Sequence, residues 1–522
     1  MQTNVHDDTL YIGLDLGTTT CKAAIYDSEL RCVGIAAEEY SLLTDDHGYI
    51  EQDPEEWWQV SCKTIRAALH KVATTLGYVA EGASPIATES ADSTSFADMT
   101  RRVRAISIST QSISVLPLDE NMRPLANAIS WLDGRGAAEV PTITSHFTIE
   151  DIYRRTGKVL RGGVYVLTKL LWWRTNEPQI WNRIRKIAFP LDYLNLRMCG
   201  RLATDHTIAG GTMFHNLAAR DWDYEILEKL EISADILPEL QDSGTFVGEV
   251  SFAAAREMGL AHDPDTYAKH PVSLMMGGQD QKVAAYGAGI RAESITLSMG
   301  TSAASEMLID VDAPSIIDTP LFASMESLPA RFCWLFPGKQ VMETSIGTAG
   351  AALRWYRDAC ASHLNYKQID ALALEVPIAP RTIFLPLLSM PSSETSACFT
   401  GLTLNSNIGA MARAVMEGVV FEMKLRLETF PGQDKASTLR LFGGGGKSPL
   451  WSQIMADILE KTIEVSEDSE LALLGAAQLA AGRPYDWTGT GIKISTYSPD
   501  SDSARLYRQK YAYYKDLRNL LK

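Results

Sequence analysis

This 522-residue sequence lacks an excess of positive charge. Its 48 lysines and arginines are outnumbered by 64 aspartates and glutamates, which gives a formal net charge of −16. A nucleic-acid backbone needs a basic face on its partner, so this charge argues against nucleic acid as the main partner. A nucleotide substrate stays compatible with it, because Mg²⁺ and a few local donors can offset the negative field.

Three further absences narrow the class of protein. The seven cysteines contain no C-x-x-C pair, which argues against a disulfide framework or a zinc site and indicates reduced thiols. The nine histidines show no H-E-x-x-H or similar metal-ligand spacing. No apolar run is long enough to span a bilayer, and residues 1–9 are polar and acidic, unlike a signal peptide. We therefore expect a soluble, cytoplasmic protein without a membrane partner.

The composition is that of an ordinary globular protein, with 46% hydrophobic and 21% charged residues, in a chain long enough for two or more domains. The polar segment 262–271, which contains two prolines, is the preferred inter-domain boundary. We expect domains at 1–265 and 266–485, with 486–522 as a C-terminal helical segment that docks on the body. Residues 81–100, rich in Ala, Ser and Thr, are expected to form an exposed loop.

The stretch 275–281, M-M-G-G-Q-D-Q, places a single carboxylate, Asp280, behind two glycines. Residues 272–276 are apolar and short enough to be a buried strand, and residues 283–290 are small and apolar. An acid at the end of a buried strand, after glycines that let a ligand approach the backbone, is well placed for a general base. The alternative is a turn carboxylate that caps the next helix.

A strand–turn–strand pattern with a glycine and hydroxyls at its tip occurs once in each half of the chain. In the first half, residues 10–16 and 21–26 are predicted strands around the tip Gly17-Thr18-Thr19-Thr20. In the second half, residues 294–298 and 303–308 flank Gly300-Thr301-Ser302. This internal echo suggests two related domains that face one another across a cleft.

The first hairpin tip has the features of a phosphate site. A glycine-led tip exposes consecutive backbone N–H groups, and the hydroxyls of Thr18, Thr19 and Thr20 add side-chain donors. Asp15 could hold Mg²⁺ through water, because Mg²⁺ prefers few carboxylates and several waters. Lys22 would supply a positive charge nearby. The alternative is a plain hairpin with a polar tip.

A glycine run, 443–446, lies between a predicted strand, 439–442, and a predicted helix, 450–460. It is followed by Lys447 and Ser448 but is not a P-loop, because that motif requires glycine where Leu441 stands. A strand, four glycines and a helix form a turn that lets a flat ring approach the backbone. The run therefore suits adenine or ribose, unless its glycines serve packing alone.

Two polar segments follow predicted strands of the first half, where open α/β sheets place their ligands. Gln111 and Ser112 follow one strand, and Trp131-Leu132-Asp133-Gly134-Arg135 follows another. Gln, Ser and Asp are residue types that hydrogen-bond sugar hydroxyls, and Trp131 could offer an apolar face. Equally, Asp133 and Arg135 could be a structural ion pair, with Trp131 in the core.

Taken together and in this order, the motifs resemble the FGGY carbohydrate kinases, which include glycerol kinase, xylulokinase and gluconokinase. The resemblance runs from about residue 10 to the C-terminus. The segments that carry it are Asp15-x-Gly17-Thr18-Thr19-Thr20, Gly277-Gly278-Gln279-Asp280-Gln281, Gly300-Thr301-Ser302, Gly443-Gly444-Gly445 before Trp451, and more weakly Glu51-Gln52-Asp53-Pro54, Trp131-x-Asp133-x-Arg135 and Leu474-Gly475-Ala476-Ala477.

The resemblance implies an α/β fold of two actin-like (ribonuclease H-like) domains with a central cleft, in which ATP and a sugar meet. It makes Asp280 the catalytic base, and Asp15 and Asp280 the Mg²⁺ ligands. The residues that it assigns to ATP are Thr18, Thr19, Thr20, Lys22, Thr301, Gly350, Arg354, Gly444 and Gly445. Those that it assigns to the sugar are Gln111, Ser112, Ile113, Asp280 and Gln281. Dimers are common among relatives, so a homodimer is one expectation.

The sequence differs from its relatives at the residues that are expected to bind the sugar. Glycerol kinases carry Arg-Glu after the glutamine that matches Gln111, and xylulokinases carry Met-His there, whereas this chain has Ser112-Ile113. The main hypothesis is ATP-dependent phosphorylation of a ketose such as D-xylulose. Gluconate, an alditol or another ketose are the alternative substrates. The alternative of another class is an actin-like, ATP-driven interaction protein.

Overall fold

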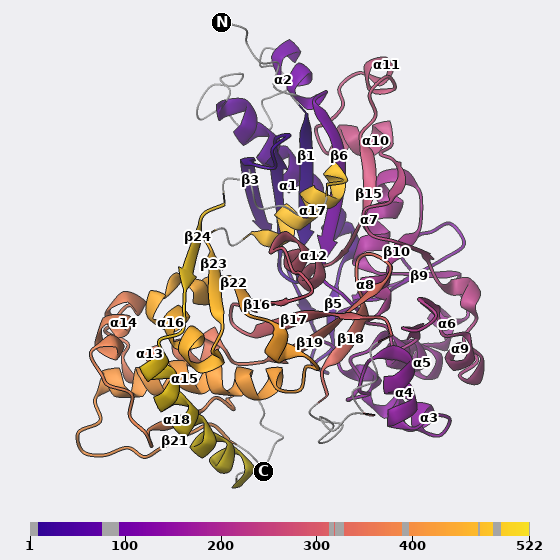
Figure 1. The fold of residues 1–522 in the computed structure, drawn as a ribbon. Coiled ribbons are helices and arrows are strands. Elements are labelled where there is room, and N and C mark those ends of the chain that lie inside the picture. Colours follow the sequence, from indigo (N-terminus) through magenta and orange to yellow (C-terminus); the bar gives the residue numbers. More distant parts are fainter. Residues whose placement is uncertain are drawn as a thin grey trace, which may run out of the picture. The chain divides into compact units, whose positions relative to one another are not determined.

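The computed structural model describes residues 9–75, 93–312, 318, 328–388, 396–467, 470–483 and 492–520. Contacts divide the chain into two compact units, whose elements are labelled in Figure 1. The first unit consists of residues 1–289, 331–340 and 471–491, and the second of residues 290–330, 341–470 and 492–522.

The first unit is built on a six-stranded sheet with the order β14-β15-β6-β1-β2-β3. The strands β1, β2 and β3 form an antiparallel meander, β6 lies parallel to β1, and β15 lies parallel to β6. β14 completes the sheet antiparallel to β15. The strand bounds are β1 Leu10–Leu16, β2 Thr20–Tyr26, β3 Cys32–Glu39, β6 Val103–Thr110, β14 Phe246–Glu249 and β15 Ser273–Gln279.

Helices cover both faces of this sheet, and glycines let them approach closely. Gly13 and Gly34 point to opposite faces, because Gly13 aligns with Ala24 and Ile35, whereas Gly34 aligns with Ile25. A Cβ on Gly13 would lie 2.1 Å from a carbonyl oxygen of α17 (Leu471–Ala481). A Cβ on Gly34 would lie 2.9 Å from a carbonyl oxygen of α1 (Pro54–Thr75). The two helices therefore pack on opposite faces.

The remaining elements of the first unit surround this core. Short strands form three pairs and one three-stranded sheet: β4 (Leu43–Thr44), β5 (Ile50–Gln52) and β8 (Ala128–Ile129); β7 (Leu116–Leu118) with β9 (Lys186–Ala188); β10 (Ala203–Asp205) with β13 (Glu239–Gln241); and β11 (His215–Asn216) with β12 (Asp221–Trp222). The helices are α2 (Ser93–Thr100), α3 (Val140–Thr144), α4 (Ile149–Thr156), α5 (Val166–Asn176), α6 (Pro178–Trp181), α7 (Pro190–Cys199), α8 (His206–Ala209), α9 (Tyr224–Lys229), α10 (Phe252–Glu257), α11 (Pro264–Tyr267) and α12 (Asp280–Gly287).

The second unit repeats the strand order of the first. Its seven-stranded sheet has the order β18-β19-β17-β16-β22-β23-β24, where β18 (Ala330–Cys333) is an additional edge strand. From β19 to β24 the order matches that of the first sheet: β16 and β17 are antiparallel, β22 and β23 follow in parallel, and β24 closes the edge antiparallel. The strand bounds are β16 Ser294–Met299, β17 Ala303–Asp310, β19 Lys339–Ile346, β22 Thr438–Phe442, β23 Thr462–Ser466 and β24 Ile494–Tyr497. The strand–turn–strand pattern predicted in each half of the chain thus belongs to a sheet that occurs in both units with the same strand order.

The other elements of the second unit are mostly helical. They are the hairpin β20 (Ile383–Leu385) and β21 (Cys398–Thr400), and the helices α13 (Gly350–Cys360), α14 (Tyr366–Leu374), α15 (Ile408–Leu427), α16 (Pro449–Leu459) and α18 (Ser501–Leu520).

The C-terminal helix α18 packs within the second unit. Tyr507, Tyr511 and Tyr514 are all buried. The Tyr507 hydroxyl donates to Glu417 Oε1 at 2.8 Å, and the Tyr514 hydroxyl donates to Glu422 Oε2 at 2.9 Å. Both glutamates belong to α15, so buried carboxylates hold the last helix on the second unit.

Several predicted elements differ from the observed ones. Part of the expected loop at 81–100 is the helix α2, since Phe96 and Met99 are buried one turn apart; residues 81–92 lie outside the described residues. The predicted boundary at 265/266 falls before β15, which is a strand of the first sheet, and the contacts place the break at 289/290. The small-residue helix α17 belongs by its contacts to the first unit.

No helix among the residues that the structure describes is long and apolar enough to cross a membrane.

Candidate functional site

The carboxyl ends of three parallel strands bring the first-unit candidates together. The registers align Asp15 of β1, Ser109 of β6 and Gly278 of β15 in one row across the sheet. Lys22 of β2 is the cross-strand neighbour of Asp15. The Ser109 hydroxyl donates to Asp15 Oδ1 at 2.7 Å. The segments that follow these strands therefore emerge at one edge of the sheet, where α/β sheets bind ligands.

Hydrogen bonds to its backbone carbonyls hold the hairpin tip between β1 and β2. Tyr40 donates from its hydroxyl to the Gly17 carbonyl and from its amide to the Thr19 carbonyl. Gln52 Nε2 donates to the Thr18 carbonyl at 2.8 Å. The carbonyls thus point inward, while the Thr19 side chain is exposed. Such a fixed, partly exposed tip can present its hydroxyls and amides to phosphate oxygens.

Gln111, predicted to bind the sugar, is 2% exposed. Its Nε2 donates to Gln52 Oε1 at 2.8 Å, and Gln52 in turn supports the hairpin tip. Gln111 Oε1 is buried without a hydrogen-bond partner among the described residues. The structure therefore gives Gln111 a supporting role beneath the tip and leaves one acceptor open.

Asp280 is the first residue of α12, directly after β15. The N-cap position belongs to Gln279, so Asp280 does not cap the helix, and its Oδ1 accepts from the Gln281 amide at 2.7 Å. A carboxylate in the first turn is favoured by the helix dipole. The structure thus places a half-buried carboxylate at the same sheet edge as Asp15 and the hairpin tip.

The two glycines before Asp280 serve packing. A Cβ on Gly277 would lie 1.6 Å from the Ile108 carbonyl oxygen, and a Cβ on Gly278 would lie 3.0 Å from Thr207 Oγ1. This differs from the expectation that they let a ligand approach the backbone, because protein atoms already fill the space.

Thr207 also fixes the turn into α12. Its hydroxyl accepts from the Gln279 amide at 2.8 Å and donates to Asp205 Oδ2 at 2.6 Å. Asp205 is buried and also accepts from the Ser243 hydroxyl at 3.0 Å. Burial raises the pKa of Asp205, and these hydrogen bonds oppose that shift. No role was predicted for Asp205 from the sequence, although an acid directly before a short helix is an N-cap signal.

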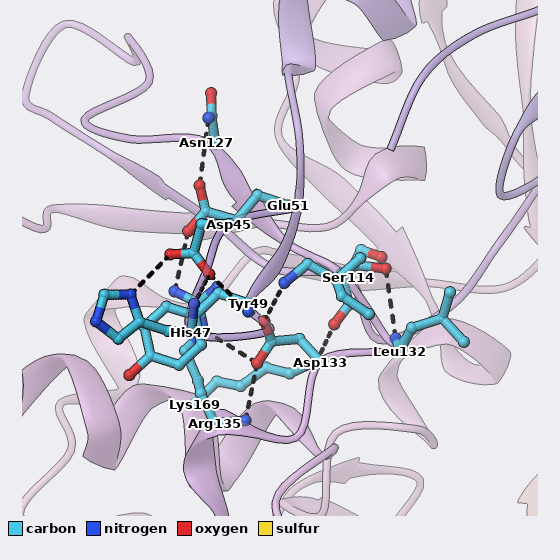
Figure 2. A network of polar contacts seen from close by, with 12 residues as sticks. Asp45, His47, Tyr49, Glu51, Ser114, Asn127, Leu132, Asp133, Arg135 and Lys169 are labelled. Carbon is cyan, nitrogen blue, oxygen red and sulfur yellow. Dashed lines mark hydrogen bonds and ion pairs between the residues drawn. The ribbon is translucent and has the colours of Figure 1, made fainter. Parts of the chain in front are cut away.

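Asp133 and Arg135 form the structural ion pair that was the alternative interpretation (Figure 2). Arg135 Nη2 lies 2.8 Å from Asp133 Oδ2, Arg135 Nη1 lies 2.9 Å from Glu51 Oε1, and both side chains of the Asp133–Arg135 pair are at most 3% exposed. Arg135 also lies over the rings of Tyr49 and Trp172, at 4.0 and 4.9 Å. Burial acts to raise the pKa of Asp133, but hydrogen bonds from Arg135 and the Ile50 amide outweigh it and lower the pKa.

Trp131, by contrast, is not a core residue. Its side chain is 38% exposed, and its indole Nε1 donates to Thr18 Oγ1 at 2.9 Å. An exposed aromatic side chain thus lies beside the hairpin tip and can offer a flat face to a ring or chain.

The glycine turn of the second unit borders a pocket of about 750 Å³. Gly443 has a φ of 89° and Gly445 packs against the Met299 side chain, so both serve the turn itself. Gly444 is different, because it is exposed and the nearest atom to an added Cβ is 4.0 Å away. The lining residues are Gly300, Thr301, Gly350, Leu353, Arg354, Asn365, Tyr366, Lys367, Asp370, Gly444, Gly445, Lys447, Ser448 and Trp451.

All five second-unit residues predicted for the nucleotide line this pocket. Gly350 is required by close packing, since a Cβ there would lie 2.4 Å from the Gly300 carbonyl oxygen at the hairpin tip. Arg354 Nη2 lies 3.5 Å from Thr301 Oγ1. The start of α13 therefore packs against the second hairpin tip, with an exposed guanidinium beside it.

The start of α14, which also lines the pocket, was not predicted from the sequence. Asn365 caps this helix and forms a capping box with Gln368, a spacing that could have identified the helix start. Asp370 follows on the same helix; burial raises its pKa, and a hydrogen bond with Ser448 opposes the shift. These residues were missed because they become pocket walls only when α14 packs beside the glycine turn.

The carboxylates of the first unit could hold a metal ion. Among the described residues, no three His, Cys, Asp or Glu side chains gather as metal ligands. Mg²⁺ needs only one or two carboxylates, because it keeps several waters. Asp15 and Asp280 at one sheet edge fit that requirement, and a zinc-like or calcium-like cage does not fit these residues.

Comparison with known proteins covers nearly the whole chain. Residues 10–287 match the N-terminal domain, and residues 296–482 the C-terminal domain, of the FGGY family of carbohydrate kinases. The xylulose kinase of Escherichia coli (strain K12) is 28% identical over 98% of this chain and 97% of that protein. The gluconokinase of Bacillus subtilis (strain 168) is 27% identical over 98% of this chain and 96% of that protein.

Solved structures agree on the fold. The crystal structure of ligand-bound xylulose kinase from Lactobacillus acidophilus aligns with a TM-score of 0.82 at 23% identity, covering 98% of each chain. The predicted class, two actin-like (ribonuclease H-like) α/β domains, is therefore confirmed. The chain belongs to the FGGY family of carbohydrate kinases and is a sugar kinase.

Proposed function

We propose that this chain transfers a phosphoryl group from ATP to a hydroxyl of a sugar, with a ketose such as D-xylulose as the first candidate. The observation that carries the proposal is the position of Asp280. It opens α12 at the carboxyl end of β15, two residues after Gly278, which shares a row with Asp15. A carboxylate beside a phosphate-binding tip is what an attacking hydroxyl requires, because it must lose a proton as it attacks.

In this mechanism Asp280 accepts the proton of the attacking hydroxyl. Its own hydrogen bond comes from the Gln281 amide through Oδ1, at 2.7 Å. The Thr207 hydroxyl holds the Gln279 amide and thereby fixes the turn that carries the carboxylate. Such preorganisation matters because a misplaced base loses much of its effect.

The hairpin tips would bind the phosphates. In the first unit, the amides and hydroxyls of Thr18, Thr19 and Thr20 donate to phosphate oxygens, and Lys22 adds positive charge. In the second unit, Thr301 at the hairpin tip and Arg354 beside it would donate hydrogen bonds to phosphate oxygens. Both line the pocket that we propose for the nucleoside. Phosphoryl transfer depends mainly on such positioning and charge stabilisation.

Asp15 and Asp280 would hold Mg²⁺, with water completing its shell, and the ion would neutralise charge on the transferred phosphoryl group. The bond between the Ser109 hydroxyl and Asp15 Oδ1 orients the Asp15 carboxylate independently of the ion.

The candidate sugar substrate is chosen from the proteins that this chain resembles. Xylulose kinases and a gluconokinase are among the relatives at 27–28% identity. The substitution of Ser112 and Ile113 for the pair that xylulokinases carry changes the residues next to Gln111. A ketose with the xylulose skeleton is therefore the first acceptor to test, and gluconate and alditols follow.

The test measures ADP formation and sugar phosphate with Mg-ATP and a panel of pentuloses, hexuloses, alditols and aldonates. We expect one acceptor to raise turnover well above the rate with ATP alone. Asp280→Asn should keep ATP binding and lose about 10²–10⁴-fold in turnover. Asp263→Asn is the matched control, because Asp263 is exposed and caps α11. An Asp280→Asn enzyme that keeps more than about a tenth of wild-type turnover would exclude base catalysis by this residue.

A further inference from the structure

Lys169 is an unusual residue for the interior of the first unit. It lies on α5, and its side chain is 0% exposed. Its Nζ donates to the Ser130 carbonyl at 2.7 Å and to the Ile113 carbonyl at 3.2 Å. Figure 2 shows Lys169 in the network with Ser114, Asp133 and Arg135. Lysines are almost never fully buried without a partner, so this placement calls for a function.

The two carbonyls belong to the two loops that carry acceptor candidates. Ile113 ends the segment Gln111–Ser112–Ile113, which follows β6, and Ser130 directly precedes Trp131, which follows β8. A second bond joins the same loops, since the Trp131 amide donates to Ser114 Oγ at 3.1 Å. Val115 and Ile129 also exchange backbone hydrogen bonds at the start of these loops, and the buried Lys169 side chain extends the connection to Ile113 and Ser130.

The loop at Ile113 needs such a constraint. Ile113 has a φ of 53°, in the left-handed region that a β-branched residue rarely adopts. Strain of this kind persists only where the surroundings hold the backbone. Gly211 makes room for the side chain, because a Cβ there would lie 2.3 Å from Ile113 Cγ2. The Lys169 bond to the carbonyl of the same residue holds its backbone.

The buried surroundings of Lys169 favour a neutral amine that donates hydrogen bonds over a charged ammonium group. Burial lowers its pKa to about 7; Asp133 opposes the shift and Arg135 adds to it. A neutral amine has two N–H donors, which matches the two carbonyls that Lys169 contacts. The side chain therefore keeps both bonds in either protonation state.

We propose that Lys169 is a positioning residue for the acceptor, which fixes the loop 111–114 against the loop 130–132. Through Trp131, whose indole donates to Thr18, it also sets both loops relative to the phosphate-binding tip. The inference rests on the proposed kinase function, in which these loops contact the sugar.

The kinetic test uses Lys169→Met, which keeps the length of the side chain and removes its donors. We expect the acceptor KM to rise and kcat/KM for the acceptor to fall by about tenfold to a hundredfold, the range that misplacement of a reactant produces. The KM for ATP should change less than the acceptor KM, because the residues proposed for the nucleoside line the pocket of the second unit and the first hairpin tip is also held by Tyr40 and Gln52. Equal losses for both substrates would overturn the proposal.

Lys461→Met is the matched control. Lys461 is 7% exposed, and its Nζ donates to two backbone carbonyls, those of Gln433 and Ala436, in the second unit. It should leave the acceptor KM unchanged. Should Lys169→Met fail to fold, Ser114→Ala removes the parallel bond from the Trp131 amide with a smaller change, and it should raise the acceptor KM in the same direction.

Hydrogen–deuterium exchange provides a readout that needs no acceptor. In Lys169→Met, amides in segments 111–116 and 129–133 should exchange faster than in wild type, while those of β1 and β2 do not change. In Lys461→Met both segments should keep wild-type rates. Unchanged exchange in Lys169→Met would overturn the positioning role even if the chain proved to have another substrate. If exchange were faster in Lys169→Met but no acceptor supported turnover, the proposed function would be wrong and the positioning of the loops by Lys169 would stand.

Discussion

The indole Nε1 of Trp131 donates a 2.9 Å hydrogen bond to Thr18 Oγ1, a residue 113 positions earlier in the chain. This bond joins the loop after β8 to the hairpin tip between β1 and β2, where we propose that the phosphates bind. If Trp131 contacts the sugar, the bond couples that contact to the Thr18 hydroxyl.

That coupling makes Trp131→Phe informative. Phenylalanine keeps an aromatic face but has no N–H, so the Thr18 hydroxyl loses its donor. Loss of one hydrogen bond of about 1 kcal/mol corresponds to a severalfold fall in kcat/KM for the acceptor. Steady-state kinetics with the acceptor varied at saturating ATP measures it. Trp355→Phe is the control, because Trp355 is similarly exposed, at 40%, and stacks on Phe384 outside the pocket. Equal effects of the two changes would contradict the coupling.

The glycine turn can be tested for nucleotide binding. Gly444→Ala adds a methyl group that meets no protein atom closer than 4.0 Å but enters the pocket. We expect the dissociation constant for ATP to rise about tenfold, a loss of roughly 1.4 kcal/mol, with the melting temperature unchanged. Isothermal titration calorimetry and thermal unfolding measure the two quantities.

Gly443→Ala provides the contrast. Its φ of 89° and the Met299 carbonyl oxygen at 2.8 Å from an added Cβ make the change a packing defect, so the melting temperature should fall. If Gly444→Ala lowered stability and left ATP affinity intact, the turn would serve packing alone.

The C-terminal helix should contribute measurably to stability. Tyr514 is 0% exposed and donates to Glu422 Oε2 at 2.9 Å. Tyr514→Phe removes a hydrogen bond to a buried carboxylate, and such bonds contribute about 1.5–3 kcal/mol. Urea unfolding should show a free energy of unfolding lower by about that amount, with a correspondingly lower midpoint. Tyr513→Phe, one position earlier and only half-buried, should change stability by less than about 0.5 kcal/mol. Equal free energies of unfolding for the two variants would contradict a role of the Tyr514 hydroxyl in docking α18.

A histidine pair in the first unit predicts acid sensitivity. His206 Nδ1 lies 3.1 Å from His215 Nε2, and both rings are buried. Burial lowers the pKa of His206 to about 4, Arg220 adds to this shift, and Asp242 and Asp221 oppose it. Burial also lowers the pKa of His215, and His206, Arg220 and Lys158 add to that shift.

The sign of the effect follows from these directions. Between the ordinary histidine pKa of about 6.5 and the lowered values, the unfolded chain binds protons that the folded chain does not, so stability falls as pH falls. Each histidine contributes a slope of up to about 1.4 kcal/mol per pH unit. His206→Gln should reduce the slope of stability between pH 6.5 and pH 4. His47→Gln, whose side chain is 77% exposed, should not alter it. A slope unchanged by His206→Gln would contradict the buried neutral pair.

Local patterns sufficed for much of the fold. The bounds of β1 and the glycine-led turn that follows it match those expected from the sequence. These features depend on residues next to one another, a short aliphatic run followed by a glycine and hydroxyl side chains. Residues 93–100 were mispredicted because only Phe96 and Met99 mark the buried face of α2 within a segment of small polar residues.

By itself, the sequence determined the two glycine–hydroxyl hairpins, the carboxylate at the end of β15 and, through the order of its motifs, the family. Only the tertiary structure decided that Gly277 and Gly278 make room for protein atoms, that Asp133 and Arg135 form a buried pair, and that Lys169 joins two loops. The physical reason is distance along the chain. Turn and strand signals act within a few residues, whereas close packing and buried hydrogen bonds join residues tens of positions apart and exist only once the sheets and helices have formed.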